Sequence, residues 1–171
     1  VIGVTNTTNN ATYYVGFVAS SSGNQALNVN TSTLTYNPGT NTLTTTTFSG
    51  TASQAKYADL AEKYTSDSEY DEGTVLIFGG RYEVTQSTLF GDSRVAGVVS
   101  IKPAYLMNAQ ANGLPVALRG RVPVRVIGPV RKGETLVSCP DGKAMVGSEN
   151  KFAIALESAG NEETSIEVVI L

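Results

Sequence analysis

"LPVALRGRVPVRVIG" (residues 114–128) is the longest β-strand pattern in this 171-residue chain. In its second half, valines alternate with charged residues and a proline. A period of two places successive side chains on opposite faces of a strand, so the valine face is predicted to be buried and the other exposed. The two faces consist of Val122, Val124 and Val126, and of Arg121, Pro123 and Arg125. Because proline cannot donate to a ladder, Pro123 predicts a strand edge or a bulge.

Shorter strand patterns recur on both sides of this stretch, from Thr74 to Leu171. The expected strands are 74–79, 81–87, 94–100, 114–128, 135–139, 143–147, 152–158 and 164–171. Turn residues separate them at Gly79-Gly80, Gly91-Asp92, Asn112-Gly113, Lys132-Gly133, Asp141-Gly142 and Gly160-Asn161. Many short strands with this punctuation predict a compact β-rich head domain over 74–171, either a β-barrel or a sandwich-like fold. The fold class expected for the chain is all-β.

Residues 1–54 form a different compositional block. The first charged side chain is Lys56, and 26 of the first fifty residues are Thr, Asn or Ser. Thr and Val alternate between breaks at Gly, Asn and Pro, which predicts short strands at 12–20, 25–32, 32–37 and 42–50. A hairpin so poor in apolar side chains is not stable alone in water. We therefore expect an extended fibrous β stalk that associates with copies of itself, and a flexible linker is the alternative.

The absence of charge fits this interpretation. Where identical chains lie side by side on a threefold axis, a charged side chain meets its own copies, and like charges in a low-dielectric seam cost several kcal/mol. Thr and Asn can instead hydrogen-bond to their copies, and the Thr methyl group packs. The composition of this block therefore suits a segment that associates with copies of itself.

Residues 53–64 ("SQAKYADLAEKY") predict one short linking helix. Apolar side chains recur at i, i+3, i+4 and i+7, and Ser53 is a suitable N-cap. The stripe consists of Tyr57, Leu60, Ala61 and Tyr64. An isolated helix of three turns is only marginally stable in water, so its apolar stripe must be buried. It could pack against the domain that follows or against the same helix in other copies of the chain. The acidic loop 65–73 ends the helix, so residues 55–73 are expected to be a helix and acidic linker.

Composition excludes several classes of function. The chain has no histidine, which removes Ser-His-Asp triads and histidine-ligated metals. It has one cysteine, Cys139, and so no intrachain disulfide. A net charge of −3 argues against general nucleic-acid binding. No stretch of 18 apolar residues and no export signal is present, so we expect a soluble protein without membrane insertion. The start at Val1 suggests a fragment or a processed chain.

A serine-based reaction is the catalytic alternative. Ser138 and Lys132 could approach each other across a hairpin, with Cys139 and Lys143 close by. No glycine-rich nucleophile elbow or oxyanion hole is recognisable, and the simpler interpretation is two strands joined by a turn. Cys139 is expected to be a small buried apolar residue. We therefore predict no enzyme and assign no catalytic, cofactor-binding or metal-binding residue.

Three surface groups remain as candidate contacts. The acidic residues of the loop could collect Ca²⁺ but lack an EF-hand pattern, so a solvated loop is favoured; they are Asp67, Glu69, Asp71 and Glu72. A basic strip could pair with the acidic loop of a neighbouring subunit; it comprises Arg119, Arg121, Arg125, Arg131 and Lys132. Sugar binding would favour exposed aromatics near carboxylates, for which the candidates are Tyr70, Tyr82 and Tyr105.

Two stretches resemble bacteriophage proteins. "LTYNPGTNTLTTTTFSGTASQAKYADLAEKY" (34–64) resembles a segment common in phage tail-fibre and virion structural proteins. The words "YDEGTVLIFGG", "DSRVAGVVSIKPAYLMN" and "LPVALRGRVPVRVIGPVRKGETLVS" resemble the C-terminal domain that accompanies it, notably in cyanophage-like viruses. The resemblance covers residues 31–171, and the run from Gly73 to Ser138 is its most specific part.

This resemblance implies a homotrimeric fibre or spike of the virion, made in the bacterial cytoplasm. Its partners would be copies of itself, other virion proteins and a host cell-surface receptor. The first alternative is a capsid or tail decoration or adaptor protein. The second is an autoproteolytic intramolecular chaperone, since some phage fibre domains cut themselves off by a serine-based reaction.

Overall fold

The computed structural model describes residues 7–24, 26–49, 54 and 57–171. The chain divides into two compact units, Val1–Ser53 and Gln54–Leu171. Among the described residues nearly all regular structure is β, and the one helical element is the 3-10 turn η1 (Pro140–Gly142). The expected all-β class is therefore confirmed. No described helix is long and apolar enough to span a membrane.

The first unit is built from very short strands. They are β1 (Tyr13–Tyr14), β2 (Gly16–Phe17), β3 (Asn28–Val29), β4 (Leu34–Asn37) and β5 (Thr42–Thr45). β1, β4 and β5 form one antiparallel sheet, and β2 pairs with β3. The β4–β5 connection is a turn in which Asn37 Oδ1 accepts a hydrogen bond from the Gly39 N–H at 2.9 Å. Such side-chain turns are typical of Asn.

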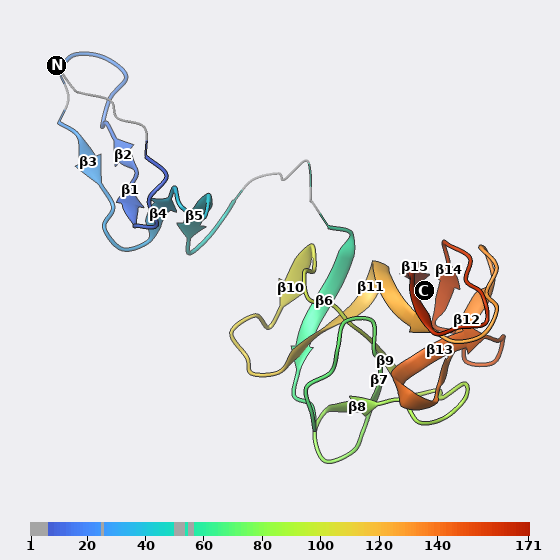
Figure 1. Cartoon of the computed structure of the whole chain (residues 1–171). Helices are drawn as coiled ribbons and strands as arrows, with labels where there is room; N and C mark the ends of the chain where they lie inside the picture. Colours follow the sequence, from blue (N-terminus) through green and yellow to red (C-terminus); the bar gives the residue numbers. More distant parts are fainter. Residues whose placement is uncertain (1–6, 25, 50–53, 55–56) are drawn as a thin grey trace. The chain divides into compact units, whose positions relative to one another are not determined.

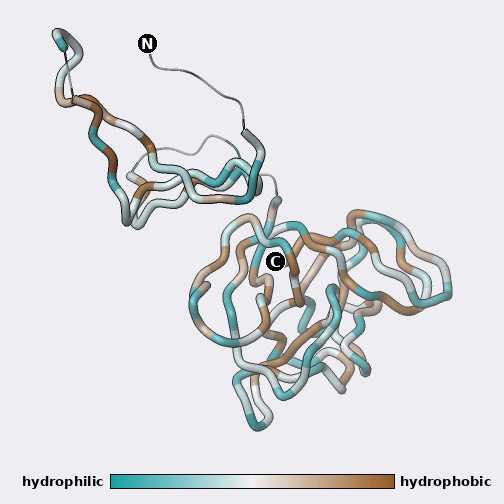
Figure 2. The backbone as a smooth tube through the Cα atoms, turned by 60° about the vertical axis from the view of Figure 1, so that its left-hand side comes forward, coloured by the Kyte–Doolittle hydropathy of each residue, from teal (hydrophilic) through white to brown (hydrophobic). Residues whose placement is uncertain are grey.

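The first unit has no core of its own within its described residues. None of residues 7–24 and 26–49 is buried. Most of its large apolar side chains are exposed, from 38% for Tyr13 to 71% for Phe48, and Val15 and Leu34 are half-buried. In Figure 2 this unit is coloured mainly in pale and teal shades, with short brown segments. What holds it together in one chain is therefore backbone pairing and polar side-chain contacts.

The second unit contains ten strands (Figure 1). They are β6 (Asp59–Tyr64), β7 (Val75–Phe78), β8 (Val84–Gln86), β9 (Val95–Val99), β10 (Tyr105–Met107), β11 (Leu114–Val126), β12 (Thr135–Cys139), β13 (Lys143–Val146), β14 (Ala153–Ala155) and β15 (Thr164–Ile170). Five of these strands close a ring in the order β11, β15, β14, β12, β13. The parallel pair Val126–Ala144 joins β13 back to β11. Of the two predicted architectures, the barrel is the one observed.

β11 links this ring to a second group of strands. Its C-terminal half pairs with β15, whereas its N-terminal half pairs with β6 and β9. β7 and β8 continue the sheet beyond β9, and β10 lies on β6. Side chains of β7 and β9 alternate between two hydrophobic clusters: Val75 and Val98 lie in one, and Leu76 and Val99 in the other. Both faces of these strands are buried, which explains their continuous apolar runs.

The predicted alternation in β11 is confirmed. Val122, Val124 and Val126 are all at most 2% exposed and belong to the larger cluster. The register of β11 against β6 shifts between Ala117 and Arg119, where a β-bulge places one extra residue in β11. The bulge changes which side of the strand the even-numbered residues face, so one strand serves both clusters.

The helix expected over 53–64 is wrong for residues 59–64, which the structure describes as a strand. Residues 59–64 form strand β6, which lies between β10 and β11. Burial follows a period of two: Asp59 and Ala61 are buried, whereas Leu60 between them is 37% exposed. Strand partners on both sides satisfy the β6 backbone, and this tertiary pairing outweighs the helical preference of a three-turn segment. The proposed N-cap Ser53 lies outside the described residues.

Candidate binding site

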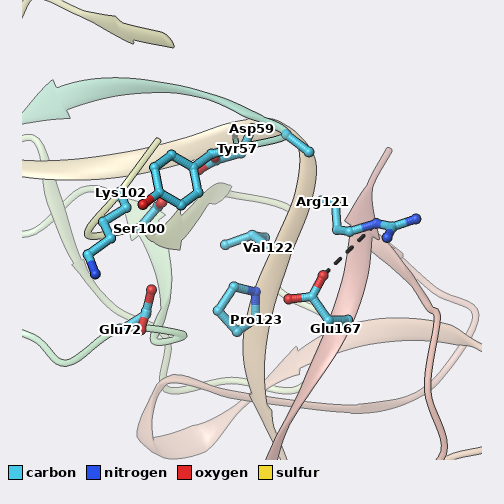
Figure 3. A pocket seen from close by; sticks show the side chains of 10 residues that line it. Tyr57, Asp59, Glu72, Ser100, Lys102, Arg121, Val122, Pro123 and Glu167 are labelled. Carbon is cyan, nitrogen blue, oxygen red and sulfur yellow. Dashed lines mark ion pairs between the residues drawn. The ribbon is translucent and has the colours of Figure 1, made fainter. Parts of the chain in front are cut away.

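A cavity of about 440 Å³ opens beside the middle of β11. The start of β6, the end of the acidic loop and the segment after β9 surround it. Its lining comprises Tyr57, Ala58, Asp59, Glu72, Ser100, Lys102, Arg121, Val122, Pro123 and Glu167 (Figure 3). All of these belong to the second unit.

Pro123 explains why the cavity opens at this point. On the side of β11 away from β15, the Arg121 N–H donates to Ala58 O at 3.2 Å and the Arg125 N–H donates to Gly73 O at 3.0 Å. Because hydrogen bonds alternate along an antiparallel strand, the N–H of the residue between them would point to the same side. Pro123 has none. The strand therefore opens here without leaving a donor unpaired, which is the local edge that the proline predicts.

Asp59 is the most unusual polar group of the cavity. It is 5% exposed, and its Oδ1 accepts a hydrogen bond from the Ala104 N–H at 3.1 Å. Its other oxygen, Oδ2, is buried and has no hydrogen-bond partner among the described residues. A buried carboxylate oxygen without a donor is destabilising, and such groups in native structures call for an explanation. Asp59 therefore lines the cavity and also carries a buried acceptor that lacks a donor.

Charges of both signs flank an apolar centre. In Figure 3, Tyr57, Val122 and Pro123 lie between two pairs of charged side chains. On one side lie Arg121 and Glu167, whose Nε and Oε2 atoms are 4.0 Å apart. On the other side lie the side chains of Lys102 and Glu72. Each rim of the cavity thus offers donors and acceptors.

The basic strip is partly neutralised within the chain. Glu163 accepts a contact of 2.6 Å from Arg125 and one of 2.8 Å from Lys143. Arg121 pairs weakly with Glu167. Glu163 directly precedes β15 and Glu167 lies on it, so both acidic partners belong to the same barrel. Pairing of the strip with the acidic loop of a neighbouring subunit stays a prediction.

The shared ion pair predicts an acid-sensitive contribution to stability. Hydrogen bonds from Lys143 and Arg125 lower the pKa of Glu163 below its ordinary value of 4.5. The stabilisation is therefore fully present above that value and is lost as the pH falls through the lowered folded-state pKa. Glu163→Gln should lower the thermal midpoint at pH 7 and flatten its fall below pH 4.5. The control is Glu162→Gln, whose carboxylate forms no ion pair within the described part of the chain. Identical acid limbs for the two variants would contradict this assignment.

The serine-based alternative finds no Ser138–Lys132 hydrogen bond within the described residues. Ser138 is fully buried; its Oγ donates to Leu89 O at 3.1 Å and accepts from the Asp92 N–H at 2.9 Å. No hydrogen bond joins it to Lys132, whose N–H donates to Ser158 Oγ. Cys139 is buried as expected, and burial raises the pKa of its thiol to about 11. Both side chains have structural contacts.

The acidic loop also holds itself together. The Tyr70 hydroxyl donates to Asp67 Oδ1 at 2.7 Å, and the Thr85 hydroxyl donates to Oδ2 at 2.8 Å. These two hydrogen bonds lower the pKa of the Asp67 carboxyl. No group of three potential ligands that could hold a metal ion occurs among the residues that the structure describes. Glu72 is the one member of the predicted acidic cluster that lines the cavity.

The aromatic candidates lie elsewhere. Tyr70 packs against the smaller hydrophobic cluster, Tyr82 is 46% exposed beneath the Arg81 guanidinium, and Tyr105 is 66% exposed on β10. The cavity instead contains Tyr57, which the helical pattern had assigned to a packing stripe. Asp59 and Lys102 were not singled out either. The sequence had marked Pro123 as a strand edge, and it had placed Arg121 in the basic strip and Glu72 in the acidic loop.

The comparisons with known proteins give no family. No protein-family model matches the chain, and the search of curated proteins finds no match.

Proposed function

We propose that this protein is a non-enzymatic structural component of a phage virion, a homotrimeric fibre or spike. The uncharged first unit would form the threefold stalk, and the β-barrel would be the head that attaches to a host surface or docks on another virion protein. It would be made in the bacterial cytoplasm and reside in the virion. The threefold symmetry is inferred from the sequence resemblance to phage fibre proteins. The uncharged composition of the first unit is consistent with it.

The observation that carries this proposal is the coreless first unit. Not one of its described residues is buried, and large apolar side chains lie on its surface. These exposed apolar side chains are Tyr13, Tyr14, Phe17, Val18, Leu27, Val29, Tyr36, Leu43 and Phe48. Exposed apolar surface on this scale marks an interaction site. Other copies of the same segment are suitable partners, since no charged side chain precedes Lys56 to repel its own copies.

Removing the first unit should abolish assembly while leaving the barrel folded. We expect a chain that starts at Gln54 to have the mass of a single chain in light scattering, because the second unit has its own closed ring and two hydrophobic clusters. Its circular dichroism should retain the β signal and a cooperative thermal transition. A truncated chain that still forms trimers would place the assembly surface on the barrel and refute the stalk as the trimer-forming segment.

A binding assay separates attachment from docking. The labelled intact protein is incubated with host cells and, in parallel, with virions that lack it. Retention on cells supports attachment. Retention on virions alone supports the adaptor or decoration role instead.

A further inference from the structure

We propose that Asn112 is a site of spontaneous covalent modification, at which the folded barrel unit converts an asparagine into aspartate and isoaspartate without an enzyme. The site lies in the second unit, and the inference does not depend on the fibre proposal. Asn112 is the one asparagine in the 171-residue sequence that a glycine follows. The sequence identifies the pair, and the contacts around it indicate that it reacts in the folded chain.

The reaction joins the main chain to the side chain of the preceding residue. The Gly113 nitrogen loses its proton and bonds to the Cγ atom of Asn112, the Cγ–Nδ2 bond breaks, and ammonia leaves. Water then opens the resulting succinimide ring at either of its carbonyl groups, which restores the Gly113 N–H and yields aspartate or isoaspartate. Water is consumed, ammonia is released, and nothing is oxidised or reduced. Glycine favours this ring closure, because it has no side chain and the widest choice of backbone angles.

The Gly113 N–H is free to react. It makes no hydrogen bond to any residue that the structure describes, and Asn112 and Gly113 are both exposed in the bend that precedes β11. The Asn112 carboxamide has no hydrogen-bond partner in the described part of the chain either. An amide that is held in a hydrogen bond would first have to give up that bond. At this pair no such bond has to break.

A cation lies next to the pair. The Lys63 Nζ atom donates to the carbonyl oxygen of Ala111, the residue before Asn112, at 3.1 Å. This ammonium forms no ion pair with a carboxylate of the described residues. Negative charge develops on the Asn112 side-chain oxygen as the nitrogen attacks, and a positive charge held nearby stabilises it. Lys63 therefore promotes the reaction.

Asp141-Gly142 is a control within the same molecule. An aspartate that precedes glycine forms the same succinimide, with water as the leaving group. Gly142 is buried, however, and its N–H donates to Ser87 O at 3.1 Å. Attack by this nitrogen would break the hydrogen bond. We therefore expect Asp141 to form isoaspartate only when the chain unfolds.

The test is incubation of the intact folded protein in mildly alkaline buffer, followed by peptide mass spectrometry and an enzymatic assay for isoaspartate. The peptide with Asn112 should gain the mass difference between OH and NH2 and separate into two products. Asn108, Asn150 and Asn161, which glycine does not follow, should convert at least tenfold more slowly. Asn112→Gln should abolish conversion at this position, because the longer side chain does not form the succinimide ring.

Two further comparisons test the part played by the fold. Lys63→Gln should slow the conversion of Asn112 about threefold or more, whereas Lys63→Arg, which keeps the charge, should retain the rate. Gly113 is left unchanged, because a Cβ added there would overlap the Tyr64 carbonyl oxygen. In concentrated urea, Asp141 should begin to form isoaspartate. Circular dichroism before and after incubation verifies that the variants and the intact chain stay folded in buffer.

Three results would overturn the assignment. They are no conversion of Asn112 in the folded chain, conversion of Asn112 only after unfolding, and conversion of the other three asparagines at the same rate. Equal rates in Lys63→Gln and Lys63→Arg would refute the electrostatic role of Lys63. Isoaspartate at Asp141 in the folded chain would show that the hydrogen bond to Ser87 does not protect it, and would contradict the argument from the free Gly113 N–H.

Discussion

Replacing Gly120 by alanine is expected to lower the free energy of unfolding by about 3–4 kcal/mol. Gly120 has φ = +102°, a conformation that side-chain-bearing residues rarely adopt. A Cβ placed there would also overlap the Ala58 carbonyl oxygen, which is backbone and cannot rotate away. Gly120 pairs with Asp59 on one side and Ile170 on the other, so the strain would fall where β11 passes from β6 to β15.

The matched control is Gly133→Ala. Gly133 has φ = +91°, but nothing lies within 4 Å of a Cβ added there. This variant should lose only the conformational contribution, about 1 kcal/mol. The chain has no tryptophan, so denaturant unfolding is followed by circular dichroism and tyrosine fluorescence. If the two variants lost the same free energy of unfolding, the steric overlap with the Ala58 carbonyl oxygen would not be the cause of the loss in Gly120→Ala.

Leu43→Asp is expected to abolish self-association. Leu43 lies on β5 and is 60% exposed in the single chain. In a threefold assembly the substitution would bring three carboxylates together. Two like charges about 4 Å apart repel each other by about 1 kcal/mol in water and by about 4 kcal/mol in a partly buried interface. The apolar contact that Leu43 would make in such an assembly would be lost as well. Light scattering should therefore give the mass of one chain.

The control for this substitution is Leu89→Asp in the barrel unit. Leu89 is 55% exposed, close to the value for Leu43, and it follows β8. The variant should keep the assembled mass, because only the surface of the first unit is expected to form the seam. If Leu89→Asp dissociates the assembly and Leu43→Asp does not, the barrel carries the interface.

The strands of the barrel were predictable because their local and tertiary signals agree. β12 matches the predicted 135–139 at both ends, and the buried valines of β11 follow from alternation alone. β6 was not predictable, since its side chains fit a helical period and only pairing with β10 and β11 decides its conformation. β10 pairs with β6 and has only three residues. Three residues are too few to show an alternating pattern in the sequence.

The cavity was only partly predictable. Pro123 marks an edge within a strand, and that edge is where the cavity lies. The orphaned oxygen of Asp59 depends on where the Ala104 N–H falls, 45 residues further along the chain. No local sequence pattern predicts a contact between residues that lie so far apart in the chain. Tyr57 lines the cavity just before strand β6. Because the sequence predicted a helix here, Tyr57 was assigned to a packing stripe and not to a binding site.

The absolute mass of the intact chain, measured by light scattering over a wide concentration range, tests the central claim most directly. The fibre proposal predicts three times the chain mass of 17.9 kDa, constant on dilution. A mass of one chain at every concentration would contradict it, and a mass of two chains would contradict the threefold seam.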